Sequence, residues 1–236
     1  MRRVHRVRAL HRLRRVHRLR QLFGSTKCRR RQKHSRAAQR VTTRTGGAAC
    51  WVVGVAGYLI LEAVAAAAYL PAYSYAHNYI SDLGRHGPRA PLMHVAFCLQ
   101  GSMFLLGALC MVGVPRNRRS RLFVGLVAAN AVGNILVGTV PSGLMHIAGA
   151  ALALAGGNAA IVAGSTLLMP SLRGYRLGST VVAALGFLCL ALLVANCRAL
   201  PVGVWERGSA YSIFLWQLLT AALLLVCRDG AALRSR

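Results

Sequence analysis

The sequence predicts an all-α integral membrane protein, a six-transmembrane-helix bundle that follows a disordered basic N-terminal arm. Two properties of the 236-residue chain indicate this fold class: 56% of its residues are apolar, and only 14% are charged. Soluble domains carry charge on about 25% of their residues, so this chain lacks much of the charge that water-exposed surfaces need. We therefore expect most apolar side chains to face lipid, in one polytopic bundle.

Six apolar runs supply the spanning helices. A hydrocarbon core of about 30 Å requires roughly 20 residues of helix at about 1.5 Å per residue, and each run reaches that length. The predicted helices cover residues 49–70, 91–114, 122–141, 145–168, 177–197 and 209–227. The membrane domain is therefore expected at 46–228, with a short cytoplasmic tail at 229–236.

The fourth predicted span is rich in small residues at helical spacing. The spacing from Gly149 to Ala153 and from Ala153 to Gly157 is four residues, so the three residues form one stripe along the helix. Small residues let the backbones of neighbouring helices approach closely. We expect this stripe to serve packing.

Arginine is distributed unequally between the two predicted sides of the membrane. With a cytoplasmic N-terminus, the inner links and the tail carry nine arginines, whereas the outer segments carry four. Four of the nine lie in 115–121 alone. Because basic residues are retained in cytoplasmic loops, the sequence predicts a multipass protein of the cell membrane with both termini in the cytoplasm.

Residues 1–45 form a separate basic arm, with 17 of the 30 Lys and Arg residues and no acid. Apolar residues recur at every third position from Val4 to Leu22. A helix turns by about 100° per residue, so this stripe winds around the axis and gives no apolar face. A disordered arm is therefore favoured over a membrane-surface helix, and nucleic-acid binding is the weakest interpretation. The near-repeat RRVHRVR and RRVHRLR leaves a misassigned start, with translation from near Val41, as a further interpretation.

Polar residues of unusual type gather near the predicted outer ends of the helices. The segment 71–90 contains the run HNYISDLG, and Glu206 and Arg207 shortly precede the sixth span. The candidate ligand-binding residues are Asn78, Ser81, Asp82, His94, Asn134, His146, Asn158, Glu206 and Arg207. A charge at the centre of a bilayer costs on the order of 2.5–3.5 kcal/mol. We therefore expect these groups to face one another rather than lipid.

Two uses of these residues stay open: interhelical hydrogen bonds, or an outward-facing polar pocket that binds a lipid or a small amphiphile. Five of them are expected to form one cluster at the outer mouth of the bundle, namely Asp82, His94, His146, Glu206 and Arg207. In this cluster Arg207 would pair with Asp82 or Glu206.

Two asparagines of the third predicted span lie deeper. Asn130 and Asn134 are four residues apart and share a helix face. We expect this face to turn toward Asn158 or Glu62.

No cofactor is firmly implied, but His94, His146 and Asp82 form a candidate ligand set for a divalent metal such as zinc. Two histidines and a carboxylate with an open fourth position are a known catalytic set. This set gives an alternative function, a metal-dependent membrane hydrolase acting on a lipid. A small-solute transporter is another alternative, because Glu62 and the asparagines offer a polar route. The sequence leaves both enzymatic activity and oligomeric state open.

Several short motifs carry a family resemblance: HNYISDLG (77–84), PLMH (91–94), GNILVGTVP (133–141), MHIAGA (145–150) and GGN (156–158). On these motifs the chain resembles a bacterial membrane family, domain of unknown function 998, over about residues 49–227. The resemblance implies six helices and no particular activity. More distantly, the ISDLG segment is similar to eukaryotic six-helix proteins of GPI-anchor remodelling and autophagy modulation.

Overall fold

The computed structural model describes residues 42–169 and 171–233, of which the part from Thr43 onward belongs to one compact unit. Six helices among the described residues are long and apolar enough to cross a membrane. They are the first spanning helix (Thr42–Ala67), α3 (Ala90–Val112), α4 (Arg118–Thr139), α5 (Leu144–Leu167), α6 (Arg173–Val194) and α7 (Val202–Leu233). The prediction of an all-α, six-span membrane protein is confirmed. The predicted arm lies outside the described residues, apart from 42–45.

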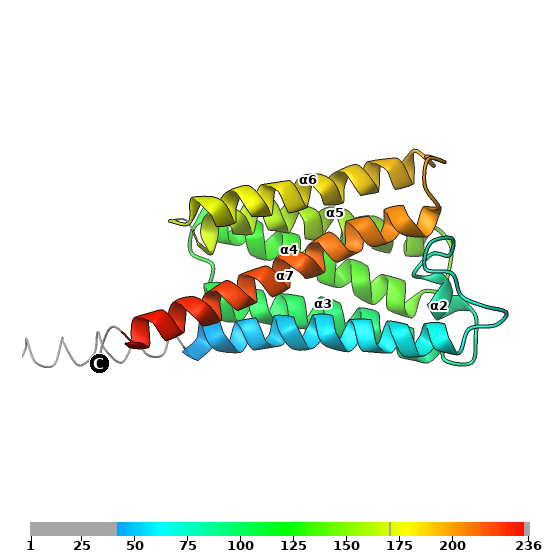
Figure 1. The fold of residues 1–236 in the computed structure, drawn as a ribbon, viewed down its shortest axis with the longest axis horizontal. Helices are drawn as coiled ribbons and strands as arrows, with labels where there is room; N and C mark the ends of the chain where they lie inside the picture. The colour runs from blue at the N-terminus through cyan, green and yellow to red at the C-terminus, as the bar shows by residue number, and fades with distance from the viewer. Residues whose placement is uncertain (1–41, 170, 234–236) are drawn as a thin grey trace, which may run out of the picture. The chain divides into compact units, whose positions relative to one another are not determined.

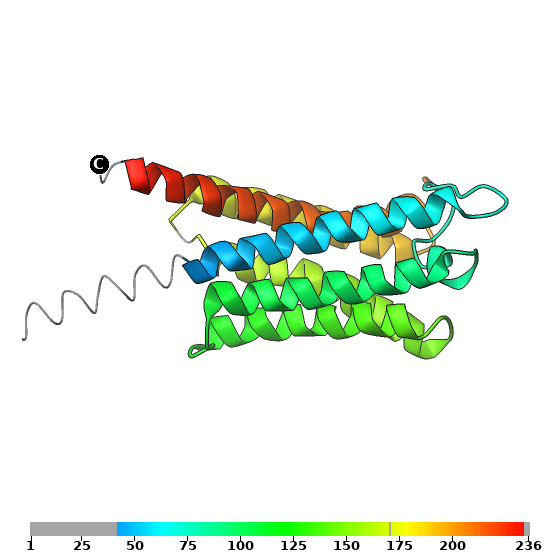
Figure 2. The same ribbon diagram turned by 90° about the horizontal axis from the view of Figure 1, so that it is seen from below.

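Consecutive helices run in opposite directions, so the links lie alternately at the two ends of the bundle (Figures 1 and 2). The segment 68–89, which includes the short helix α2 (Asp82–Arg85), lies at one end together with the links from α4 to α5 and from α6 to α7. We call this end of the bundle the capped end. The links from α3 to α4 and from α5 to α6 lie at the other end.

The last spanning helix extends beyond its predicted boundaries at both ends. It begins at Val202, before the predicted position 209, so Glu206 and Arg207 lie within α7 rather than in a link. Both side chains have partners that offset the cost of burying a charge. α7 also continues to Leu233, through most of the predicted tail.

Local sequence signals explain where the helices begin and end. α4 starts with a capping box, in which the Asn117 side chain accepts from Ser120 N at 2.8 Å while Ser120 Oγ accepts from Asn117 N at 3.3 Å. This reciprocal pair satisfies amide groups that a helix start leaves without partners. Gly113 ends α3 with φ 69° and Gly143 precedes α5 with φ 88°. Glycine adopts such positive φ values without steric cost.

The predicted small-residue stripe of α5 does serve packing. A Cβ atom added to Gly133 of α4 would lie 2.3 Å from the backbone N of Ala153 and 2.5 Å from the carbonyl O of Gly149. The backbones of α4 and α5 are therefore in direct contact. Gly157 faces both α4 and α7, where an added Cβ would lie 2.7 Å from Nδ2 of Asn130 and 2.3 Å from Cδ1 of Ile213.

An aromatic core fills the half of the bundle away from the capped end. The ring centroid of Trp51 lies 5.4 Å from that of Phe104 and 5.3 Å from that of Trp216. The indole Nε1 of Trp51 donates to Phe104 O, and that of Trp216 donates to Ser179 Oγ, each at 3.0 Å. These contacts join the first spanning helix, α3, α6 and α7.

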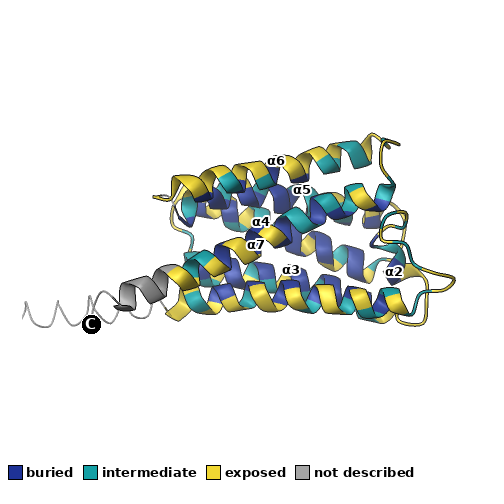
Figure 3. Ribbon diagram, in the orientation of Figure 1, coloured by how far each residue is buried: buried dark blue, intermediate teal, exposed yellow. Residues whose placement is uncertain are grey.

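The outer surface of the bundle is apolar, as a lipid-facing surface requires. α6 has the highest mean hydropathy of the six spans, 2.4, and only 17% of its most apolar stretch is buried. Its exposed side chains include Leu177, Val181, Leu185 and Leu188. Figure 3 shows the exposed residues along the outer faces of the helices and the buried ones turned toward the bundle interior.

Candidate functional site

A buried ion pair joins the first spanning helix to α7 near the capped end. Arg207 Nη2 lies 3.0 Å from Glu62 Oε1, and the hydroxyl of Tyr211 donates to Glu62 Oε2 at 2.6 Å. Glu62 is 1% exposed and Arg207 is 7% exposed. Both carboxylate oxygens of Glu62 therefore have partners, which offsets the cost of burying its charge.

The same guanidinium holds the segment 68–89 on the bundle. Arg207 Nη1 donates to the carbonyl oxygens of Tyr75 at 2.7 Å and Asn78 at 3.1 Å. Its Nη2 also donates to the hydroxyl of Tyr73, which in turn donates to Tyr79 O at 2.8 Å. Burial raises the pKa of Tyr73 above its ordinary value, so the phenol keeps the proton that it donates.

The predicted pairing of Arg207 with Asp82 or Glu206 is wrong. Glu206 Oε2 accepts from the backbone N of Ile80 at 2.5 Å. Asp82 Oδ2 accepts from Tyr79 N at 2.9 Å, and Asp82 Oδ1 lies 3.8 Å from Arg85. Both acids thus bind the segment 68–89, which we call the capping segment, while Arg207 pairs with Glu62 of the first spanning helix.

The two candidate histidines have separate backbone partners. His94 Nε2 lies 2.7 Å from Gly84 O, and His146 Nδ1 lies 2.7 Å from Val140 O. Within residues 42–169 and 171–233, no group of three or more His, Cys, Asp or Glu residues is placed to hold a metal ion. The hydrolase with a metal at His94, His146 and Asp82 stays a prediction, as does the transporter.

The asparagines have hydrogen-bond partners other than the predicted ones. Asn130 Nδ2 donates to Ala153 O of α5 at 2.6 Å, and Asn134 Nδ2 donates to Asn130 O at 3.0 Å. Asn158 Nδ2 donates to Ser209 O of α7 at 3.2 Å and to its Oγ at 3.1 Å. The face with Asn130 and Asn134 therefore does not bind Asn158 or Glu62. Asn78 Oδ1 accepts from Ser74 N at 2.9 Å within the capping segment.

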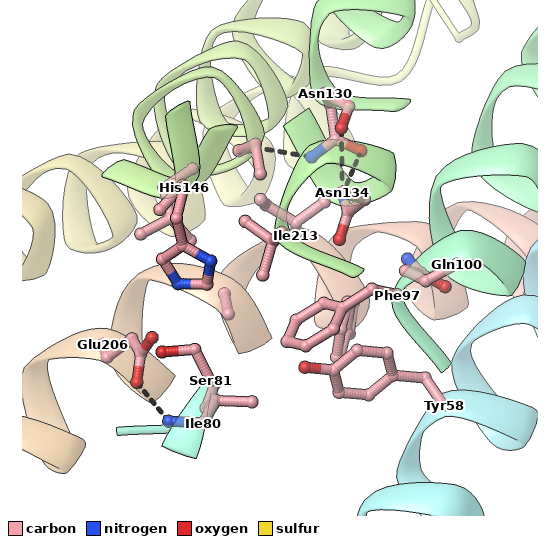
Figure 4. Close-up of a pocket in the computed structure, with 16 residues that line it drawn as sticks. Tyr58, Ile80, Ser81, Phe97, Gln100, Asn130, Asn134, His146, Glu206 and Ile213 are labelled. Carbon is pink, nitrogen blue, oxygen red and sulfur yellow. Dashed lines mark hydrogen bonds between the residues drawn. The ribbon is translucent and has the colours of Figure 1, made fainter. Parts of the chain in front are cut away.

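A pocket of about 50 Å³ lies in the half of the bundle nearer the capped end (Figure 4). The first spanning helix, the capping segment, α3, α4, α5 and α7 all contribute to its wall. Its polar lining residues are Tyr58, Ser81, Gln100, Asn130, Asn134, His146 and Glu206. The apolar part of the wall is formed by Ile80, Phe97, Val137, Ala150, Ala153, Leu154, Ala210, Ile213 and Phe214.

This pocket brings together four of the predicted candidates: Ser81, Asn134, His146 and Glu206. Asn78, Asp82 and Arg207 lie in or against the capping segment but do not line the pocket, and Asn158 binds α7. His94 lines a different groove, between α3 and α4, with Cys98 and Thr139 among its neighbours. The expected single cluster is therefore divided between the pocket, the ion pair and this groove.

Sequence reasoning missed the partner of Arg207. Glu62 is the only acid within the predicted spans, and an ionisable residue inside a membrane segment marks a site together with its partner. That signal could have found Glu62. No comparable signal marks Tyr73 and Tyr211, because tyrosines near the ends of spans are common as interfacial anchors.

The comparisons with known proteins give one result. A family model described as "Protein of unknown function (DUF998)" matches residues 52–223, more than two-thirds of the chain. No curated protein and no solved structure matches the chain. The matched range runs from the first spanning helix into α7 and so includes the ion pair and the pocket. The chain is a multipass membrane protein that belongs to the DUF998 family.

Proposed function

We propose that this protein binds the polar end of a lipid or a small amphiphile in the pocket at the capped end. One observation supports the proposal: polar groups from six segments of the chain converge on a single pocket whose remaining wall is apolar. Ligand sites typically combine an apolar wall with a few placed polar groups. Interhelical hydrogen bonds alone would not need Ser81, His146 and Glu206 to share a pocket with Asn134.

The size of the pocket suggests how much of a ligand it holds. Sites for drug-sized ligands measure about 300–1,000 Å³, whereas about 50 Å³ has room for a few water molecules or a small polar group. The pocket wall includes Ala150 and Leu154 of α5, which are half-buried and so also reach the surface of the bundle. A headgroup in the pocket could therefore remain attached to chains in the surrounding bilayer.

The charge distribution supports an outward orientation for the capped end. Four exposed arginines lie at the opposite end, in and beside the link from α3 to α4: Arg116, Arg118, Arg119 and Arg121. At the capped end, Glu62 neutralises Arg207, which leaves fewer free positive charges there. By the positive-inside rule, the capped end faces the outside of the cell membrane and both termini are cytoplasmic.

Two leucine substitutions on one helix test the pocket. Ala150→Leu adds a side chain at the pocket wall, whereas Ala148→Leu adds the same side chain at an exposed position two residues away. Native mass spectrometry of protein purified in mild detergent should find a bound lipid or amphiphile on the wild type and on Ala148→Leu. Ala150→Leu should lose it. Equal retention by all three proteins, or no bound species on any, would contradict the proposal.

A further inference from the structure

The donors and acceptors in the pocket point to the chemistry of its ligand. We infer that the pocket takes an ammonium group, carried by either a free alkylamine or the ethanolamine headgroup of a phospholipid. This inference rests on the proposed function and makes the class of ligand specific. It follows from which polar atoms of the lining already have protein partners and which do not.

Each amide nitrogen of the lining donates to an oxygen of the protein. Asn130 Nδ2 donates to Ala153 O at 2.6 Å, and Gln100 Nε2 donates to Gln217 Oε1 at 2.7 Å. Asn134 Nδ2 donates to both oxygens of Asn130, at 3.0 Å to the backbone O and 3.1 Å to Oδ1. These contacts also fix the orientation of the Asn134 amide, because an oxygen in the Nδ2 position would face two other oxygens.

Three acceptor atoms of the lining have no protein donor. With Nδ2 of Asn134 held by Asn130, Oδ1 of Asn134 is turned toward the pocket (Figure 4). His146 Nδ1 bonds the carbonyl oxygen of Val140 and must therefore carry a proton, so Nε2 of the neutral ring is an acceptor. Glu206 binds Ile80 N through Oε2 alone, which leaves Oε1. The hydroxyls of Tyr58 and Ser81 can donate or accept, so they do not discriminate between ligands.

The charge of the pocket agrees with this inventory. Glu206 is an acid, and no Lys or Arg lines the pocket. The nearest arginine in sequence, Arg207, directs its guanidinium to Glu62, Tyr73 and the carbonyls of the capping segment. A phosphate or carboxylate would therefore meet a carboxylate and further acceptors with no cation to offset them. An ammonium group brings one positive charge and three N–H donors.

The size of the pocket also favours this group. An ammonium on a short carbon stem is compact enough for about 50 Å³, whereas a trimethylammonium group is bulkier and has no N–H to donate. The two groups carry the same charge. A comparison between them therefore separates hydrogen-bond donation from charge alone.

The experiment uses the full chain in nanodiscs, with three phospholipids of identical acyl chains as probes. Native mass spectrometry should find phosphatidylethanolamine bound in preference to phosphatidylcholine and phosphatidylglycerol. In a second arm, thermal unfolding in detergent should shift upward with propylammonium chloride and not with sodium chloride at equal ionic strength. A response to phosphatidylethanolamine, to propylammonium or to both supports the ammonium site. A response to only one of them identifies the source of the ammonium group.

Two variants link such binding to the pocket. Glu206→Gln keeps an oxygen for Ile80 N but removes the charge, and it should weaken binding about tenfold or more, the effect of losing a hydrogen bond to a charged group. Asp82→Asn makes the same change in the capping segment, outside the pocket lining, and should leave binding unchanged. The unfolding temperature of each variant without ligand separates lost binding from lost folding.

The outcomes also separate this inference from the proposed function. If phosphatidylcholine or phosphatidylglycerol binds as well as phosphatidylethanolamine, and Ala150→Leu abolishes that binding, the pocket is a lipid site but the ammonium inference is wrong. Equal stabilisation by sodium and propylammonium would likewise overturn it. If Ala150→Leu changes the binding of none of the probes, both the inference and the proposed function fail.

Discussion

Arg207 and Glu62 form a buried ion pair with a 3.0 Å separation between Nη2 and Oε1, although 145 residues separate them in the chain. Glu62 lies near the end of the first spanning helix, and Arg207 lies in the second turn of the last one. Because Arg207 also binds backbone carbonyls of the capping segment, this one side chain connects three parts of the fold. The capping segment forms part of the pocket wall, so the pair supports the pocket without lining it.

Removing one member of this pair should destabilise the protein strongly. Glu62→Gln or Arg207→Leu leaves the other charge buried without its counter-ion, and breaking such a pair costs about 3–5 kcal/mol. Unfolding by SDS titration measures the free energy. The matched control is Arg85→Leu, because Arg85 is exposed and lies 3.8 Å from Asp82, and exposed pairs contribute about 0–1 kcal/mol. Equal losses for Arg207→Leu and Arg85→Leu would contradict the structure.

Two glycines of α4 should respond oppositely to alanine. At Gly133 an added Cβ would overlap backbone atoms of α5, while at Gly125 it would meet no atom within 4 Å. Gly133→Ala should therefore destabilise the bundle by about 1–3 kcal/mol through overpacking. Gly125→Ala should be neutral or slightly stabilising, because alanine favours helix. The same SDS titration compares them, and a tolerant Gly133→Ala would mean that α4 and α5 are further apart.

The amide pair between α3 and α7 should show coupled effects. Gln100 Nε2 donates to Gln217 Oε1 at 2.7 Å, and both residues are buried. Gln100→Leu or Gln217→Leu alone leaves the remaining amide without its partner, at a cost of about 1–3 kcal/mol. The double variant removes both amides and should lose less stability than the sum of the single variants. A double-mutant cycle measures this difference, and strict additivity would show that the two amides do not interact.

The orientation of the bundle is tested by cysteine labelling. His86 is exposed in the capping segment and Arg116 is exposed in the link at the opposite end. In a variant whose native cysteines are replaced by serine, a membrane-impermeant maleimide added to intact cells should label His86→Cys. It should label Arg116→Cys only after the membrane is permeabilised. The reverse pattern would place the capped end in the cytoplasm and overturn the orientation.

The sequence by itself determined the membrane architecture. Six apolar runs of spanning length are visible without any partner, because the bilayer sets the length that one helix must have. The α5 stripe of Gly149, Ala153 and Gly157 also marked a packing surface in advance, because close backbone approach requires small side chains wherever the neighbouring helix lies.

Only the tertiary structure decided which polar groups meet. A soluble helix shows in its sequence which face turns inward, because its polar residues mark the outer face. These helices are largely apolar on all sides, so the sequence does not reveal how each one is rotated about its axis. The pairing of Arg207 with Glu62 rather than Asp82, and the choice of Asn134 but not Asn158 for the pocket, depend on that rotation. It is set by backbone contacts such as Gly133 against Ala153, which exist only once the helices have packed.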